Sequence, residues 1–194
     1  MAGTSADEVV KVALSMIGEQ PVDGIDEDSP IAATCRIYLP FALKAILERY
    51  PWRFAQKRVV LAHEDAAPVF GFAYQFVPPA DFISVTQIDS DRDSLYSVED
   101  NRILSDSETI SLQYTAEQVK YSAMPSLFSL AFAAMLGMLV AGNTAGGDTK
   151  VADLERRYLT FLNEAILFDK RTGFGVSEES EYQAKDGSWL TRNG

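Results

Sequence analysis

The chain is poor in the residues that most often build metal sites and disulfides. Its 194 residues include one cysteine, Cys35, and one histidine, His63. A single cysteine cannot form a disulfide within the chain, and one cysteine with one histidine cannot assemble the common zinc ligand sets. The sequence therefore predicts no internal disulfide and no structural zinc, and nothing in it indicates another metal or a cofactor.

Recognisable catalytic motifs are also missing. No serine stands in the G-x-S-x-G pattern, and no glycine-rich segment ends in the Lys-Ser/Thr of a phosphate-binding loop. Asp89, Asp91 and Asp93 alternate like the start of a calcium loop. The sixth position is Ser94 instead of glycine and the twelfth is Asp100 instead of glutamate, so we expect a solvated turn. We predict that the chain is not an enzyme.

Positive charge is scarce as well. Lys and Arg number 17 against 28 Asp and Glu, which gives a formal net charge of -11. Nucleic-acid phosphates and anionic membrane surfaces both favour patches of Lys and Arg, so we expect no unaided nucleic-acid binding. Residues 1–8 lack the basic and apolar regions of a signal peptide, and a cytoplasmic origin is therefore expected.

Helical patterns begin the chain. Residues 4–8 supply capping and acidic residues, apolar side chains follow at helical spacing, and Gly18 should end this first helix. The pair Ser29-Pro30 is a typical start for a second helix, which should end at Pro51. Pro40 lies inside the second helix and removes one backbone donor, so we expect a bend or a restart there.

Two more helical patterns close the chain. Residues 125–141 are almost wholly apolar and lack a flanking basic cluster, so a buried core helix is expected instead of a membrane span. After a loop at 143–148, apolar residues recur at steps of three and four, the spacing of a helix packed lengthwise on another. This last helix should lie antiparallel on the apolar one. Its apolar positions are Val151, Leu154, Tyr158, Phe161, Ala165 and Phe168.

Between these pairs of helices, residues 58–115 change to a period near two. β-branched and aromatic residues are frequent there, turn residues separate the runs, and Glu99-Asp100-Asn101 suits a tight hairpin. We predict one small antiparallel sheet built from the runs 59–62, 82–88, 95–98, 102–104 and 109–114.

The predicted fold is α+β and mainly α. It is a four-helix bundle (residues 1–57 and 116–170) with a small antiparallel β-sheet subdomain (58–115) inserted between helices two and three. Residues 171–194 are polar and rich in glycine and are expected to form an extended C-terminal arm.

The aromatic and apolar residues of this arm are its candidate binding residues. The plain interpretation is a frayed terminus with incidental aromatic side chains. The alternative is an arm that orders against a neighbouring subunit, anchored by Phe174, Tyr182, Trp189 and Leu190.

Several short motifs follow one another along the first part of the chain. They are Leu14-Ser15-Met16-Ile17-Gly18-Glu19, Pro21-Val22, Pro51-Trp52-Arg53-Phe54-Ala55 and Pro78-Pro79-Ala80-Asp81-Phe82. Their order resembles the tail tubular protein A family, the head-to-tail adaptors of short-tailed bacteriophages. The likeness is clearest over the first 80 residues and continues as an architectural similarity to about residue 169. The family usually has Leu-Pro-Ala-Asp where this chain has Pro-Pro-Ala-Asp, and Pro40 has no counterpart.

The resemblance implies a structural virion protein made in the host bacterial cytoplasm. It would form a dodecameric homo-oligomeric ring between the portal protein and the tail nozzle, tail tubular protein B. Double-stranded DNA would pass through the ring during ejection without specific binding, because an acidic lumen offers few sites for phosphate. No membrane span is expected. The functional sites of such a protein would then be its exposed surfaces and the C-terminal arm instead of a pocket.

Two alternatives remain open. One is a head-completion connector of a long-tailed phage, which would have a different partner below the ring. The other is a small helical ligand-binding regulator or enzyme. A deep polar cavity near His63 would favour the second alternative.

Overall fold

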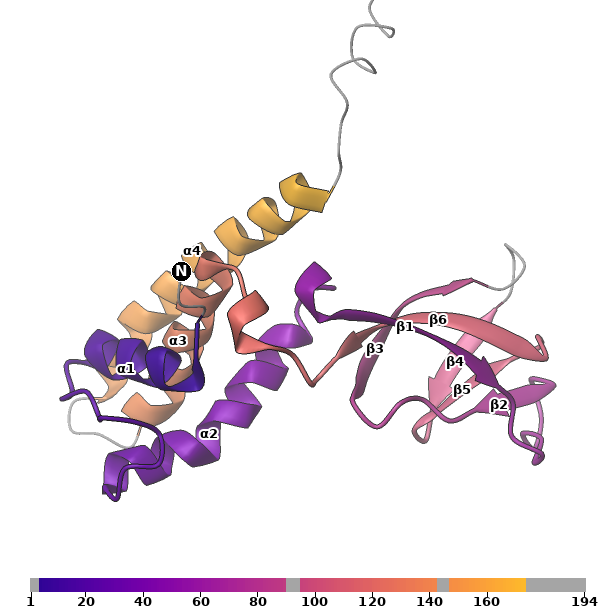
Figure 1. The fold of residues 1–194 in the computed structure, drawn as a ribbon, viewed down its shortest axis with the longest axis horizontal. Coiled ribbons are helices and arrows are strands. Elements are labelled where there is room, and N and C mark those ends of the chain that lie inside the picture. The colour runs from indigo at the N-terminus through magenta and orange to yellow at the C-terminus, as the bar shows by residue number, and fades with distance from the viewer. Residues whose placement is uncertain (1–3, 90–94, 143–146, 174–194) are drawn as a thin grey trace, which may run out of the picture.

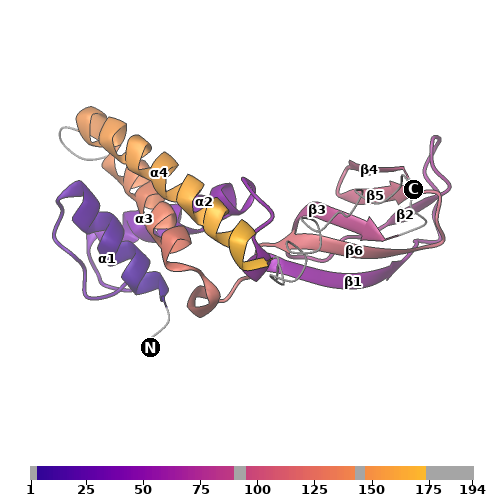
Figure 2. The same ribbon diagram turned by 90° about the horizontal axis from the view of Figure 1, so that it is seen from above.

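The computed structural model describes residues 4–89, 95–142 and 147–173, which form a helical part and a β part joined end to end (Figures 1 and 2). In chain order the elements are α1 (Ala6–Ile17), α2 (Pro30–Leu47), the 3-10 turn η1 (Arg53–Ala55), β1 (Gln56–Ala62), β2 (Tyr74–Phe76), β3 (Phe82–Asp89), β4 (Tyr96–Glu99), β5 (Arg102–Ser105), β6 (Thr109–Ala116), the 3-10 turn η2 (Tyr121–Ala123), α3 (Ser126–Ala141) and α4 (Gly147–Gly173).

α1 begins and ends, and α2 begins, where their capping residues predict, whereas α2 ends at Leu47, before the expected end at Pro51. The hydroxyl of Ser5 accepts a hydrogen bond from the Glu8 amide, and the Glu8 carboxylate accepts one from the Ser5 amide, which forms a capping box for α1. Gly18 ends α1 in the left-handed conformation, with φ of 74°. Ser29 caps α2 and Pro30 occupies its first turn.

Pro40 does not divide α2. The helix is continuous from Pro30 to Leu47, so the restart expected at residue 40 does not occur. Pro40 is exposed, and on that side water can solvate the carbonyl group that loses its backbone partner. By length and composition alone, α2 is long and apolar enough to cross a membrane, and 39% of that apolar window is buried in the structure.

The four helices do not form the predicted four-helix bundle. In a bundle each helix turns one apolar face toward a shared core, whereas α3 is apolar on every side and lies in the middle of the other three. The extensive helix–helix contacts are those of α3 with α1, α2 and α4. No residue of α3 after Ser126 is exposed.

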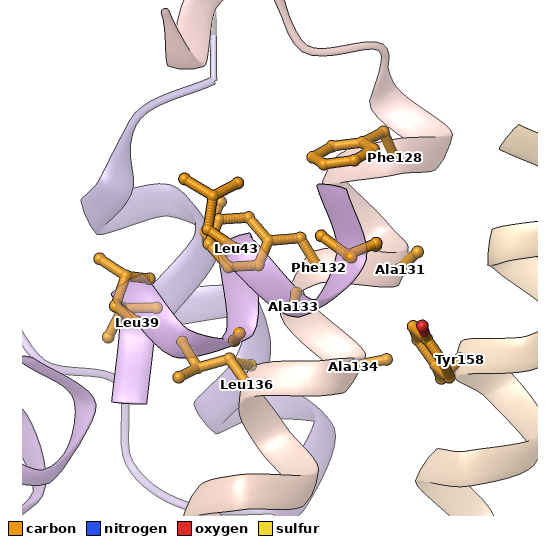
Figure 3. Close-up of a cluster of buried hydrophobic side chains, with 14 of the residues drawn as sticks. Leu39, Leu43, Phe128, Ala131, Phe132, Ala133, Ala134, Leu136 and Tyr158 are labelled. Carbon is orange, nitrogen blue, oxygen red and sulfur yellow. The ribbon is translucent and has the colours of Figure 1, made fainter. Parts of the chain in front are cut away.

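Small and large side chains alternate around α3. Leu39 and Leu43 of α2 lie on one side of α3, and Tyr158 of α4 lies on another, beside Ala134 (Figure 3). The alanines of α3 let α4 approach closely, and the larger Phe132 fills the space between helices. This arrangement explains why α3 shows no polar stripe in its sequence.

The predicted antiparallel packing of α4 on α3 is confirmed (Figure 2). α4 has 27 residues and α3 has 16, so the C-terminal turns of α4 extend beyond the start of α3. Residues 171–173, which were expected to begin the arm, are the last residues of this helix.

The β part contains two three-stranded antiparallel sheets, and the prediction of a single sheet is wrong. Their strand orders are β1-β6-β3 and β2-β5-β4. β2 was missed because its three residues are too few to show a period. Asp100 and Asn101 have positive φ angles of 44° and 55° and form the predicted hairpin between β4 and β5.

The two sheets enclose a second, smaller core. Phe76 and Ile103 come from one sheet, and Ile110, Leu112 and Tyr114 of β6 come from the other. β6 is the central strand of its sheet, and from Thr109 to Tyr114 its buried residues alternate with more exposed ones, as expected for a strand with one solvated face.

We expect substitutions of Gly137 to reveal the close packing around α3. A Cβ at this position would lie 3.4 Å from the Ala13 carbonyl oxygen and 3.5 Å from Leu154 Cδ1. Gly137→Ala should change the free energy of unfolding little, because the new methyl group makes ordinary contacts and alanine favours helix. Gly137→Leu should lower it by about 1–3 kcal/mol through overpacking. Urea unfolding measures both variants, and a leucine variant as stable as the alanine variant would contradict the packing.

Candidate functional site

The described surface carries open grooves. Two of them have volumes of about 460 Å³, one on the outer face of the β1-β6-β3 sheet and one beside the junction of the helical and β parts. Both are lined by Arg58 and Gln113, and neither is lined by Asp, Glu, His, Lys or Cys. These two grooves therefore bring together no acid–base pair of the kind that general acid–base catalysis uses.

The single histidine and the single cysteine lie apart. His63 is exposed, with Nδ1 2.8 Å from the Glu64 carbonyl oxygen, and it lines none of the grooves at the sheet, the junction or the tip of the β part. Cys35 is fully buried in the helical core, and burial raises the pKa of its thiol. Within residues 4–89, 95–142 and 147–173 no three His, Cys, Asp or Glu residues gather as metal ligands.

Trp52 anchors the junction between the two parts. Its side chain is fully buried, and Nε1 donates a hydrogen bond of 2.9 Å to the Ile46 carbonyl oxygen near the end of α2. Its ring packs edge-on against Tyr50 and against Phe128 at the start of α3, and Phe54 packs against Phe128 as well. Trp52 and Phe54 therefore both fold back onto the start of α3.

Arg53 connects the junction to the end of α4. Its amide donates to Asp169 Oδ1 at 3.3 Å, and its Nε lies 3.5 Å from Asp169 Oδ2. Its guanidinium group also lies against Gly173, in the space that a Cβ there would occupy. Asp169 is 4% exposed. Burial raises the pKa of Asp169, and its contacts with Arg53 and Tyr50 offset the rise only in part.

A second set of polar contacts holds the base of the β part. Lys57 of β1 donates to the carboxylate of Asp81, and the Tyr114 hydroxyl of β6 donates to the same carboxylate at 3.1 Å. Burial raises the pKa of Asp81, but the hydrogen bonds from Lys57 and Tyr114 outweigh it and leave the pKa below its ordinary value. Asp81 thus ties the segment before β3 to two other strands.

The far end of the β part exposes apolar side chains. We call residues 63–73, which connect β1 to β2, the tip loop; they lie at the end of the molecule away from the helices (Figures 1 and 2). Val69 is 98% exposed and Phe70 is 86% exposed. A groove of about 360 Å³ runs beside them, with Glu99 and Asp100 in its lining.

The helical part exposes two other apolar surfaces. On the outer face of α2, Ile37 is 62% exposed and Phe41 is 66% exposed. On the C-terminal turns of α4, Leu167 is 59% exposed and Phe168 is 38% exposed. Contiguous exposed apolar surface can mark a contact with a partner.

The residues predicted to bind partners are not among these surfaces. Phe174, Tyr182, Trp189 and Leu190 lie outside the described residues, as do Asp91 and Asp93 of the calcium-like run. The Arg53–Asp169 contact was missed because 116 positions separate the two residues. The tip loop had one signal in the sequence, an aperiodic apolar run, Pro68-Val69-Phe70-Gly71-Phe72, among turn residues.

Comparison with known proteins adds no relative: no protein-family model and no curated protein matches this chain.

The raised pKa of Asp169 gives a testable pH dependence. The folded chain binds a proton at Asp169 more readily than the unfolded chain does. Protonation of Asp169 therefore contributes to the free energy of unfolding. This contribution is present in full below the ordinary aspartate pKa and is lost as the pH rises through the raised pKa of Asp169 in the folded chain. Asp169→Asn removes this titration, so the stability of the unsubstituted chain relative to this variant should fall across that window.

Urea unfolding at a series of pH values measures the difference. Glu164→Gln, at an exposed position of α4, is the control for loss of a surface carboxylate. A difference between the unsubstituted chain and Asp169→Asn that stays constant or grows with pH would contradict the buried position of this carboxylate.

Proposed function

We propose that the chain is a subunit of an adaptor ring that joins the portal of a short-tailed phage to its tail nozzle. The observation that carries this proposal is the presence of separate exposed apolar surfaces on the helical part and at the end of the β part. A subunit of a ring between two other rings needs different contact surfaces toward its neighbours and toward the proteins above and below it.

The motifs that resemble the adaptor family have a structural role consistent with this proposal. Gly18 ends α1, the Pro51-Trp52-Arg53-Phe54-Ala55 segment forms the junction, and Asp81 ties the base of the β part. Each motif therefore lies where one part of the molecule is joined to the next.

The charge of the chain is also consistent with a passage for DNA. With a net charge of -11, a ring of these subunits would present few cationic groups to phosphates and would let DNA slide. Among the described residues, Arg53 and Lys57 both lie against carboxylates. These pairings reduce the positive charge at the junction.

Reconstitution with the portal protein encoded in the same genome tests the proposal. We expect the chain to add a ring of density to the portal in electron micrographs, and expect a variant lacking residues 174–194 to do so less completely with unchanged helical circular dichroism. Normal docking of the truncated chain would show that residues 174–194 are not needed for binding to the portal. A full chain that stays monomeric and unbound beside the portal would contradict the adaptor function.

A further inference from the structure

The tip loop is the most exposed apolar feature of the described chain. Val69 and Phe70 are both more than four-fifths exposed. Burial of exposed valine and phenylalanine side chains against a partner is favourable, because it removes apolar surface from water. The described residues offer these side chains no cover, which indicates an intermolecular contact.

Acidic side chains surround this apolar tip. Glu99 and Asp100 line the groove beside Phe70, and Asp106 accepts a hydrogen bond from the Ala73 amide at the end of the loop. Arg102 is the nearby cation, and it lies 2.7 Å from the Glu64 carboxylate. A matching surface should therefore be apolar and carry basic groups, whereas an anionic membrane would be repelled.

The C-terminal turns of α4 have these properties. Leu167 and Phe168 are exposed there, and Lys170 and Arg171 follow them on the same turns. Neither Lys170 nor Arg171 has a carboxylate partner among the described residues. We call these four residues the α4 end. Asp169, which lies between them in sequence, is buried and faces Arg53 instead of the surface.

The outer face of α2 fits less well. Its exposed Ile37 and Phe41 have Lys44 nearby, but Glu48 follows one turn later and the segment 23–28 before α2 is rich in Asp and Glu. Arg36 already donates to the carbonyl oxygens of Ile25 and Glu27. The acidic tip loop therefore has better charge complementarity with the α4 end than with α2.

We propose that the tip loop of one copy docks on the α4 end of a second copy. This inference rests on the proposed ring and names the surfaces through which neighbouring subunits meet. The two surfaces differ and lie far apart on one chain, so each copy can use both at once. Such heterologous contacts propagate from copy to copy and close into a ring when the rotation between copies permits.

Disulfide trapping tests this contact in the full-length chain. The native thiol, Cys35, is buried, so introduced cysteines are the exposed ones. Val69→Cys mixed with Leu167→Cys should form a cross-linked dimer several-fold faster under mild oxidation than Val69→Cys mixed with Phe41→Cys. The α2 position is a matched control because Phe41 is about as exposed as Leu167. Both mixtures are measured in concentrated solution and on portal rings.

Charge reversal provides a second, independent test of the contact. Lys170→Glu with Arg171→Glu should slow the Val69–Leu167 cross-link several-fold, and reversing the exposed Asp65 and Glu99 to lysine in the other copy should restore it. Lys44→Glu on α2 should leave the rate unchanged. Equal trapping at positions 167 and 41, or no response to charge reversal, would overturn the proposed contact.

The same samples distinguish failure of this contact from failure of the adaptor function. Portal-bound rings without the Val69–Leu167 cross-link would overturn the contact and leave the adaptor function standing. A cross-link in solution without portal binding would support the contact and contradict the adaptor function. Binding to phosphatidylcholine vesicles that is lost in Phe70→Ser would instead assign the tip loop to a membrane and overturn the contact.

Discussion

Burial of the Trp52 side chain is the interaction on which the arrangement of the two parts depends. Trp52 follows α2 by a few residues and precedes β1, and its ring packs on Phe128 in the first turn of α3, where the chain has returned from the β part. One side chain thus holds the two points at which the chain crosses between helices and strands. Its hydrogen bond to the Ile46 carbonyl oxygen gives the buried indole N–H an acceptor.

The contacts around Trp52 extend this anchor to the last helix. Arg53 contacts Asp169 of α4, and Trp52 contacts Phe128 of α3, so α2, α3 and α4 all pack against the junction that leads to the β part. We infer that the molecule behaves as one elongated body. An elongated body with apolar surfaces on separate parts suits a role in assembly better than it suits binding of a small ligand, for which convergent polar groups in a deep pocket are needed.

The sequence predicted the elements better than their arrangement. Ser5, Gly18 and the pair Ser29-Pro30 act through local hydrogen bonds and backbone angles, so both ends of α1 and the start of α2 could be predicted. The all-apolar pattern of α3 predicted burial but not which helices would surround it. For this reason the four-helix bundle was wrong, although α+β as a class was right.

Long-range pairing explains the other errors. β1 pairs with β6 across about 50 residues of chain, and the division of six strands between two sheets depends on such pairings instead of on local period. The contact of Arg53 with the buried Asp169 likewise has no local signature. The exposed tip loop could have been found from its aperiodic apolar run, because apolar residues beside turn-forming Pro68 and Gly71 are poorly placed for a core.

The claim that Trp52 makes the two parts one body can be tested by a distance measurement between spin labels. Labels on cysteines introduced at exposed Lys11 of α1 and exposed Asp65 of the tip loop would span the molecule, with native Cys35 buried. Electron–electron double resonance should give a single narrow distance distribution in the full chain. A broad or multiple distribution would show that the β part moves independently of the helices and would contradict the account.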